Sequence, residues 1–345
     1  MINLSGRGEA PSIGVLGAGA WGTALAQVLA SDGRPVLLWA RDPALADAIN
    51  THHRNEAYLP AAALSPHIRA TAGLEELADC AILLAVTPAQ AMAQVLARLP
   101  DGPRDLVLCS KGIERGTGRL MNEVARDVLP ASTPAVLSGP TFAHEVAAGL
   151  PTAVTLACGG GEAQWERLST AIARPAFRPY YTDDVAGAEV AGAIKNVLAI
   201  ASGLIEGLGL GQNARAAMIA RGYAEMLRFG EALGARRETL NGLCGLGDLV
   251  LTCTSSASRN YSLGLALGRG EAAAGLLAGQ HSLTEGAHTA PVLAQLAKRH
   301  GLQMPIAMAV RDILAGADAP AMVERLLARP LRREAGPGVP HGAGR

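Results

Sequence analysis

The sequence predicts an α/β protein in which a doubly wound, Rossmann-type parallel sheet domain is followed by an all-helical C-terminal domain. The first half alternates short apolar runs with helical patterns, which is typical of parallel strands joined by right-handed crossover helices. From about Asp183 onward the strand signals fade, and long patterns rich in Ala, Leu and Gly replace them. At 345 residues the chain is long enough for two domains of ordinary size.

The strands of the sheet are predicted from runs rich in Val, Ile and Leu. These runs lie at 12–16, 36–39, 81–86, 106–110, 135–138, 152–158 and 177–181. Helices are expected between them, for example at 21–31, 88–98 and 162–173. The segment TDD at 182–184 then supplies a cap for the first helix of the second domain.

The predicted domain limits follow from these patterns. Residues 1–11 form a flexible N-terminus, 12–183 the dinucleotide-binding Rossmann-type domain and 184–330 the helical substrate domain. The tail at 331–345 is rich in Gly, Pro and Arg, and we expect it to be disordered.

Composition excludes several classes of protein. The formal net charge is zero and no basic run occurs, so the electrostatic footprint of a nucleic-acid binder is missing. The N-terminus has no apolar region typical of a signal peptide, and no uninterrupted apolar stretch is long enough to span a bilayer. The five cysteines are scattered and the histidines form no H-E-x-x-H pattern, which predicts reduced core cysteines and no metal site. We therefore expect a soluble, cytoplasmic protein.

A glycine motif follows the first predicted strand. In GVLGAGAWGTALA, Gly17, Gly19 and Gly22 have the G-x-G-x-x-G spacing, at the point where a strand gives way to a helix. These glycines permit a tight turn, close approach of the backbone to a pyrophosphate, and tight packing of the helix on the strand. The helix N-terminus also stabilises negative charge. This context predicts a dinucleotide-binding site.

The end of the second predicted strand bears on the choice of cofactor. An acidic residue about twenty residues past the glycines binds the ribose 2′-hydroxyl of NAD, whereas an arginine there meets the 2′-phosphate of NADP. Arg41 occupies this place in LLWARD, so we predict NADPH/NADP as cofactor, with NADH/NAD used as well. An error of one residue would put Asp42 there instead, and Arg41 would then only face solvent.

Lys195 lies in the middle of an apolar helical segment, AGAIKNVLAIASG at 191–203. The chain has 30 cationic residues, but only Lys111, Lys195 and Lys298 are lysines. Lysine, unlike arginine, exchanges a proton when its pKa is lowered. A buried lysine also needs a partner, because an unpaired buried ammonium is costly. Lys195 is therefore a candidate for proton chemistry, whereas Lys298, in the polar AKRH, is interpreted as a surface residue.

The helical face around Lys195 consists of small side chains. Residues three, four and seven positions away share that face, and they are Ala188, Gly192, Ala199 and Ser202. Such a face leaves room for a ligand, but it also suits close packing between helices, and the sequence leaves both interpretations open.

Two features of GLCGLGDLVLTCTSSASRN indicate a site. Asp248 lies in a Gly-rich turn beside an apolar run, where it is predicted to orient Lys195 and hold it protonated, so that the two form a candidate catalytic pair. Ser258, Arg259 and Asn260 gather a hydroxyl, a guanidinium and an amide just before a predicted helix, which suits a phosphate. The alternative is an ordinary helix cap with a surface arginine.

Two further segments follow predicted strands of the sheet. Lys111 follows the strand at 106–110, and Gly139 and Thr141 follow the strand at 135–138. Because ligands bind at the carboxyl ends of strands in open parallel sheets, we expect these residues on the rim of the binding crevice.

Taken together, these stretches resemble the bacterial NAD(P)-dependent glycerol-3-phosphate dehydrogenases. The likeness runs from about residue 12 to residue 330 and rests on GAGAWGTALA, SKGIE, SGPTFAHEVAAGLPTA, AGAIKNVLAIASG and GLGDLVLTCTSSASRN. It implies reversible reduction of dihydroxyacetone phosphate to sn-glycerol 3-phosphate, which feeds glycerophospholipid synthesis. It also implies that the usual partner is a second copy of the chain, in a homodimer.

The resemblance further implies roles for individual residues, with Lys195 as the catalytic acid/base. The implied substrate contacts are Lys111, Gly139, Thr141, Lys195, Asp248, Ser258, Arg259 and Asn260. Besides the three motif glycines, the implied cofactor contacts are Ala20, Trp21, Arg41, Lys111, Ala143, Arg259, Leu283 and Glu285. Around the last two, in HSLTEGAHT, the pattern is looser.

Physical chemistry agrees with this reaction. Negative charge grows on the C2 carbonyl oxygen as hydride arrives, and a positioned ammonium stabilises that charge and delivers a proton. Two other functions remain open from the sequence. Another two-domain dehydrogenase, acting on a 3-hydroxy acid, would share the fold, although the Ser/Arg/Asn cluster favours a phosphorylated substrate. A non-enzymatic NADP(H) sensor would share only the first domain and would have no use for Lys195.

Overall fold

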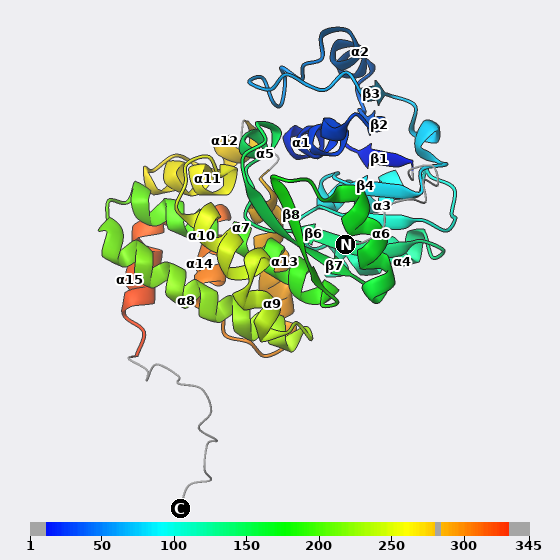
Figure 1. Cartoon of the computed structure of the whole chain (residues 1–345). Coiled ribbons are helices and arrows are strands. Elements are labelled where there is room, and N and C mark those ends of the chain that lie inside the picture. The colour runs from blue at the N-terminus through cyan, green and yellow to red at the C-terminus, as the bar shows by residue number, and fades with distance from the viewer. Residues whose placement is uncertain (1–11, 280–283, 331–345) are drawn as a thin grey trace, which may run out of the picture.

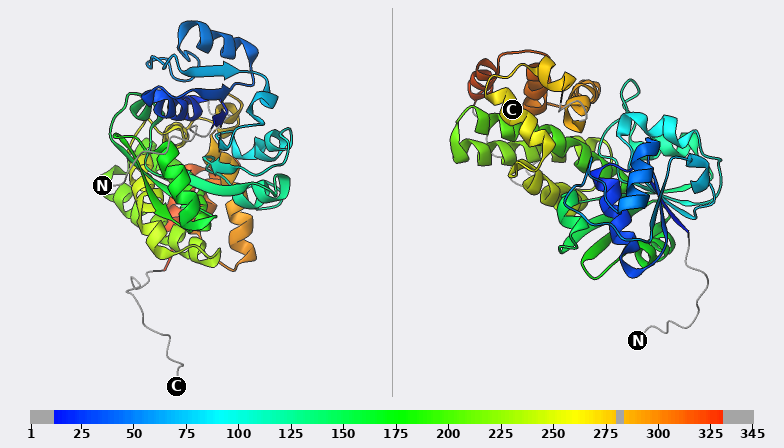
Figure 2. Two further views of the ribbon diagram at one scale, coloured as in Figure 1. Left: turned by 45° about the vertical axis from the view of Figure 1, so that its right-hand side comes forward. Right: turned by 90° about the horizontal axis from the view of Figure 1, so that it is seen from above.

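The computed structural model describes residues 12–279 and 284–330. The predicted flexible N-terminus at 1–11 and the predicted disordered tail at 331–345 lie outside the described residues, as does Leu283. Figures 1 and 2 show two lobes side by side, with the sheet in the N-terminal lobe and a group of helices in the other.

In the described part of the chain, eight strands form one sheet in the order β3-β2-β1-β4-β5-β6-β7-β8. Their bounds are β1 Ile13–Leu16, β2 Val36–Trp39, β3 Ile68–Thr71, β4 Ile82–Ala85, β5 Asp105–Leu108, β6 Thr133–Ser138, β7 Thr152–Cys158 and β8 Phe177–Thr182. All neighbours from β3 to β6 are parallel, which confirms the predicted doubly wound arrangement. Each strand that was predicted from the sequence is present, within a few residues of its predicted limits.

Two features of the sheet differ from the sequence prediction. β7 runs antiparallel to β6, while β8 is parallel to β7. The link between β6 and β7 holds only the short helix α5 (Ala143–Ala147), which is too short for the crossover that a parallel pair needs. The prediction also missed β3, a four-residue edge strand whose apolar run is interrupted by the exposed Arg69.

Helices cover both faces of the sheet and build the second lobe. Those connected with the sheet are α1 Ala20–Leu29, α2 Pro43–His52, α3 Met92–Leu96, α4 Met121–Val128, α5 and α6 Gly161–Ile172. The second lobe contains α7 Val185–Gly207, α8 Gly211–Ala232, α9 Arg237–Asn241, α10 Asp248–Cys253, α11 Arg259–Gly268, α12 Ala273–Ala278, α13 Glu285–Arg299, α14 Pro305–Leu314 and α15 Ala319–Leu327. A π-helical turn, η4 (Leu243–Gly247), precedes α10.

α7 is the central helix of the second lobe, and it is buried along almost its whole length. As predicted, its first turn is capped within TDD, since the Asp184 carboxylate accepts the Gly187 N–H at 2.9 Å. By length and hydropathy alone α7 qualifies as a membrane span, yet 94% of its most apolar window is buried inside the protein. It is therefore the core helix of the lobe.

Close packing between α7 and α11 depends on glycine. A Cβ atom added to Gly203 would lie 1.9 Å from the Tyr261 carbonyl oxygen, and one added to Gly264 would lie 2.0 Å from the Ile200 carbonyl oxygen. The two backbones thus approach as closely as helices can. This contact fixes the N-terminus of α11 beside the middle of α7, where the candidate site lies.

The apolar core is continuous between the two lobes. One buried cluster joins α7 and the helices around it to one face of the sheet, and a second lies under α1 and α6 on the other face. All five cysteines fall within the described residues, where each is buried with a free thiol, as predicted.

Candidate active site

Lys195 and Asp248 meet inside the second lobe. The Lys195 Nζ donates a hydrogen bond of 2.8 Å to Asp248 Oδ1, between the middle of α7 and the first residue of α10. Asp248 is completely buried and Lys195 is 6% exposed. The structure therefore joins the two residues that the sequence singled out as a candidate pair.

A second lysine binds the same carboxylate. Lys111, three residues after β5, donates to Asp248 Oδ2 at 2.6 Å and to the Gly139 carbonyl at 3.1 Å. Burial by itself raises the pKa of Asp248, but the two lysines outweigh it and hold this pKa below its ordinary value. The carboxylate is thus ionised, and the trio carries one net positive charge when both lysines are protonated. Such a cluster favours an anion or a developing oxyanion.

Burial lowers the pKa of Lys195 to about 8. Asp248 opposes this shift, while the positive charge of Lys111 adds to it. A lysine with a pKa near neutrality can both give and take a proton under physiological conditions, which is what acid/base catalysis requires. Thr252 fixes the direction of the ammonium group, because its Oγ accepts a hydrogen bond from Lys195 Nζ at 2.9 Å.

The small side chains on the Lys195 face serve packing. Gly192 lies under the side chain of Lys111, so that an added Cβ would come within 3.2 Å of Lys111 Cγ and 3.3 Å of Ser138 Oγ. Ser202 is fully buried and donates to the Cys253 carbonyl at the end of α10. Of the two interpretations left open by the sequence, close packing therefore describes Gly192 and Ser202.

The cluster at the start of α11 is only partly free to bind a ligand. Ser258 is the N-cap of α11, and its Oγ accepts the Tyr261 N–H at 3.3 Å. Asn260 links two other helices, donating to Asn196 Oδ1 at 3.0 Å and accepting the Gly286 N–H at 2.9 Å. Arg259 is exposed at the helix N-terminus. The cap interpretation thus holds for Ser258, while Arg259 and the helix N-terminus remain the groups suited to a phosphate.

The turn after β6 forms the floor beside Lys111. Gly139 has a φ of +153° and is packed so closely that an added Cβ would lie 3.0 Å from Val154 Cα. Its carbonyl oxygen accepts hydrogen bonds from Lys111 Nζ and, at 3.3 Å, from the Thr141 hydroxyl. Both residues thus lie where the sequence placed them, at the carboxyl end of a strand next to the lysine cluster.

The glycine motif forms the turn that its spacing predicts. Gly17 has a φ of +118°, and an added Cβ on Gly22 would lie 1.8 Å from the Gly17 carbonyl oxygen, so helix α1 packs against the turn as closely as possible. Gly19 is the N-cap of α1, and a Cβ there would meet nothing within 4 Å. This open space lies directly at the N-terminus of α1, where a pyrophosphate binds in this kind of fold.

Two buried polar atoms, one beside the glycine turn and one next to the loops after β4 and β5, fit a bound dinucleotide. The indole nitrogen of Trp21 is buried without a hydrogen-bond partner among the described residues, and the same is true of Glu285 Oε2. Glu285 begins α13 and reaches across to the sheet lobe, where its Oε1 accepts the Ala89 N–H at 3.2 Å. Burial raises its pKa, and the nearby charge of Arg259 partly offsets this.

Ala20 and Ala143 border the same turn. Ala20 is the first residue of α1, and Ala143 is the first residue of α5, which packs against α1 (Figure 1). Arg41 follows β2 and is exposed, while the Asp42 carboxylate is engaged in capping α2 through the Ala44 N–H at 3.0 Å. At this position the Arg41 guanidinium is therefore the group available to bind a 2′-phosphate.

Three relevant residues were given no role by the sequence analysis. Thr252 is four residues after Asp248 on α10, a spacing that could have been read as one helical face. Asn196 bridges Asn260 and the Lys111 carbonyl, the latter at 3.4 Å, and nothing in the sequence marks that link. Ser138 is the third. Its hydroxyl is buried without a partner among the described residues, which can be recognised only once the position of α7 is known.

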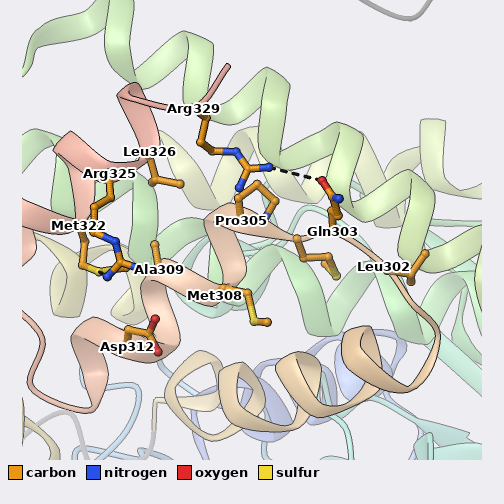
Figure 3. Close-up of a pocket in the computed structure, with 11 residues that line it drawn as sticks. Leu302, Gln303, Pro305, Met308, Ala309, Asp312, Met322, Arg325, Leu326 and Arg329 are labelled. Carbon is orange, nitrogen blue, oxygen red and sulfur yellow. Dashed lines mark hydrogen bonds between the residues drawn. The ribbon is translucent and has the colours of Figure 1, made fainter. Parts of the chain in front are cut away.

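The structure also contains a cavity of about 320 Å³ away from this site, between α14 and α15. Figure 3 shows that Met308, Met322, Arg325 and Arg329 line it, and Arg329 contacts Gln303 at its edge. None of the lining residues belongs to the lysine cluster or the glycine turn. Among the described residues, no group of three His, Cys, Asp or Glu side chains is placed to hold a metal ion.

Comparisons with known proteins agree with this geometry. Residues 12–164 match the N-terminal part, and residues 184–324 the C-terminal part, of the family described as NAD-dependent glycerol-3-phosphate dehydrogenase. A glycerol-3-phosphate dehydrogenase (NAD(P)+) from Erythrobacter litoralis is 67% identical over 322 residues, which cover 93% of this chain and 97% of the relative. One from Novosphingobium aromaticivorans is 64% identical over 324 residues, or 93% and 98% of the two chains. The crystal structure of the glycerol-3-phosphate dehydrogenase from Coxiella burnetii superimposes with a TM-score of 0.87 at 40% identity, covering 92% of this chain and 99% of that one.

Proposed function

This chain belongs to the NAD-dependent glycerol-3-phosphate dehydrogenase family, and on that premise we propose that it reduces dihydroxyacetone phosphate reversibly to sn-glycerol 3-phosphate with Lys195 as proton donor. It is an oxidoreductase that uses NAD(P). The observation that carries the proposed role is the buried contact of 2.8 Å between Lys195 Nζ and Asp248 Oδ1.

The dinucleotide would be held by the glycine turn. Gly17, Gly19 and Gly22 shape the turn, the N-terminal amides of α1 would bind the pyrophosphate, and Trp21 and Glu285 would supply polar atoms that have no partner among the described residues. When bound in reduced form, the nicotinamide supplies the hydride for the C2 carbonyl carbon. We assign to Arg41 a contact with the 2′-phosphate, which favours NADPH over NADH.

Lys195 acts at the carbonyl oxygen. Its ammonium group stabilises the negative charge that grows there and then transfers a proton to the new alkoxide, and in the reverse direction the neutral amine takes that proton back. Asp248 and Thr252 hold Nζ in one direction, so no reorganisation is needed when the charge appears. Lys111 keeps Asp248 ionised and adds a second positive charge close to the reacting oxygen.

The phosphate end of the substrate would be bound at the N-terminus of α11. Arg259 offers a guanidinium that grips phosphate through paired hydrogen bonds, and the helix N-terminus adds favourable N–H groups. Binding energy from this non-reacting end orients the carbonyl toward Lys195. The proposal extends to a homodimer that works in the cytoplasm and supplies glycerol 3-phosphate for phospholipid synthesis.

One assay tests the proposed reaction. The purified protein is mixed with NADPH, and the loss of its absorbance is followed with and without dihydroxyacetone phosphate. We expect oxidation of NADPH only when the substrate is present, and formation of NADPH from NADP with sn-glycerol 3-phosphate. Oxidation with a 3-oxo acid but not with dihydroxyacetone phosphate would contradict the proposal.

A further inference from the structure

Ser138, the last residue of β6, has a buried hydroxyl group without a hydrogen-bond partner in the part of the chain that the structure describes. The residue is 4% exposed, and its Oγ contacts no donor or acceptor among the described residues. An unpaired buried hydroxyl costs free energy, so a group of this kind in a well-packed region calls for an explanation. The other buried serines near the site, Ser202 and Ser258, both have partners.

Ser138 lies against α7 close to the reacting centre. Its Oγ would lie 3.3 Å from a Cβ added to Gly192, which is one helical turn before Lys195 on the same face. The side chain of Lys111 packs against the same glycine and extends to Asp248. Ser138 therefore adjoins the lysine cluster on the side of the sheet.

The start of α11 meets α7 at Asn196, the residue after Lys195, whereas Ser138 meets α7 at Gly192, three residues before Lys195. Asn260, in the first turn of α11, contacts Asn196, and the rest of α11 packs against α7 from Ile200 onward. The order along α7 is thus Ser138 at Gly192, then Lys195, then the N-terminus of α11. For a substrate whose phosphate is bound by Arg259 and whose carbonyl lies at Lys195, the unpaired Ser138 hydroxyl beside the lysine cluster is a group suited to bind the remaining carbon's hydroxyl, on C1.

We propose that the Ser138 hydroxyl binds the free C1 hydroxyl of the substrate, an inference that rests on the function proposed above. A serine hydroxyl is a neutral group that both donates and accepts, and it matches another neutral hydroxyl better than a phosphate, which the cationic groups serve. Ser138 is then the specificity-determining residue that distinguishes a hydroxymethyl ketone phosphate from a methyl ketone phosphate. The Ser138 hydroxyl has no partner among the described residues, and the C1 hydroxyl of the substrate would be that partner.

A double comparison of enzyme and substrate tests this assignment. Ser138→Ala and the wild type are each assayed with dihydroxyacetone phosphate and with the analogue that lacks the C1 hydroxyl, acetonyl phosphate. We expect the wild type to prefer dihydroxyacetone phosphate by about tenfold or more in kcat/KM, because loss of the substrate hydroxyl leaves Ser138 unpaired. Ser138→Ala should lose most of this preference, mainly through the rate with dihydroxyacetone phosphate.

Ser132→Ala is the matched control. Ser132 lies just before the other end of β6 and is also buried, but its hydroxyl donates to the Leu129 carbonyl at 2.7 Å. Without ligands, Ser132→Ala should lower the melting temperature, whereas Ser138→Ala should leave it unchanged or raise it. Ser132→Ala should keep the wild-type preference between the two substrates.

The possible failures can be told apart. If the wild type does not reduce dihydroxyacetone phosphate, the proposed function fails and this assignment fails with it. If the wild type is active but Ser138→Ala keeps the full preference for the C1 hydroxyl, only the assignment is overturned. A fall in melting temperature for Ser138→Ala as large as that for Ser132→Ala, with the preference retained, would give Ser138 a structural role instead.

Discussion

Lys195 and Asp248 form a buried ion pair, with Nζ 2.8 Å from Oδ1, between the middle of α7 and the first turn of α10. Removing both charges from water is costly, and a pair of this kind is weak as a source of stability. The pair is accompanied by Lys111 on the other carboxylate oxygen, so the site holds more positive than negative charge. This imbalance suits a reaction in which negative charge develops on the substrate.

The pH dependence should follow the state of Lys195. Because its pKa is lowered to about 8, reduction of the ketone, which needs the ammonium form, should lose kcat/KM as the pH rises through that value. Oxidation of the alcohol needs the neutral amine, so its kcat/KM should rise over the same pH interval. Profiles measured in both directions on one preparation check this, and profiles that fall together would contradict it.

Arg259 should matter mainly for capture of the phosphate. Arg259→Ala removes a charge-assisted contact worth roughly 1.5–3 kcal/mol, so kcat/KM for dihydroxyacetone phosphate should fall at least about tenfold. Inorganic phosphate should also inhibit the variant less than the wild type. Arg269, exposed at the other end of α11, provides the control: Arg269→Ala should change neither quantity. An unchanged KM and unchanged phosphate inhibition in Arg259→Ala would refute the assignment.

Arg41 should set the preference between the two cofactors. Arg41→Ala is expected to raise the KM for NADPH several-fold while leaving NADH nearly unaffected, because only NADPH carries the 2′-phosphate. The adjacent residue serves for comparison, since Asp42→Ala removes the cap of α2 and should lower stability without changing selectivity. An equal rise in the KM for NADPH and for NADH in Arg41→Ala would mean that the arginine only positions the loop.

The sequence predicted the sheet and the separate parts of the site because both depend on local patterns. Strand runs, the glycine turn and the N-cap at Asp184 are encoded within a few residues of each other. The reversed direction of β7 could not be predicted in this way, because it depends on how the short link after β6 packs. β3 was missed because its four residues include an exposed arginine.

The contacts within the site were harder to predict than its members. Lys111 and Asp248 were each identified, yet their hydrogen bond joins residues 137 positions apart, and no local pattern encodes it. The same holds for the bridge from Asn196 to Asn260, 64 positions apart. Ser138 carries no sequence signal, because a serine at the end of a strand becomes unusual only when α7 closes over it.

The role of Lys195 is tested most directly by comparing Lys195→Arg and Lys195→Met with the wild type. Arginine keeps the charge but does not exchange protons near neutral pH, whereas methionine keeps the apolar stem and removes the proton. Both variants should fold, and Met should not leave Asp248 without a partner, because Lys111 still binds its other oxygen. Lys298→Met, at an exposed position, controls for loss of a lysine elsewhere.

The decisive measurement is the turnover of Lys195→Arg with dihydroxyacetone phosphate and NADPH, alongside its cofactor affinity and melting temperature. If Lys195 is the proton donor, kcat should fall by about 10²-fold or more while cofactor binding and folding stay normal, and Lys195→Met should behave alike. Turnover of Lys195→Arg within a few-fold of the wild type would contradict this role, because a fixed positive charge would then be sufficient.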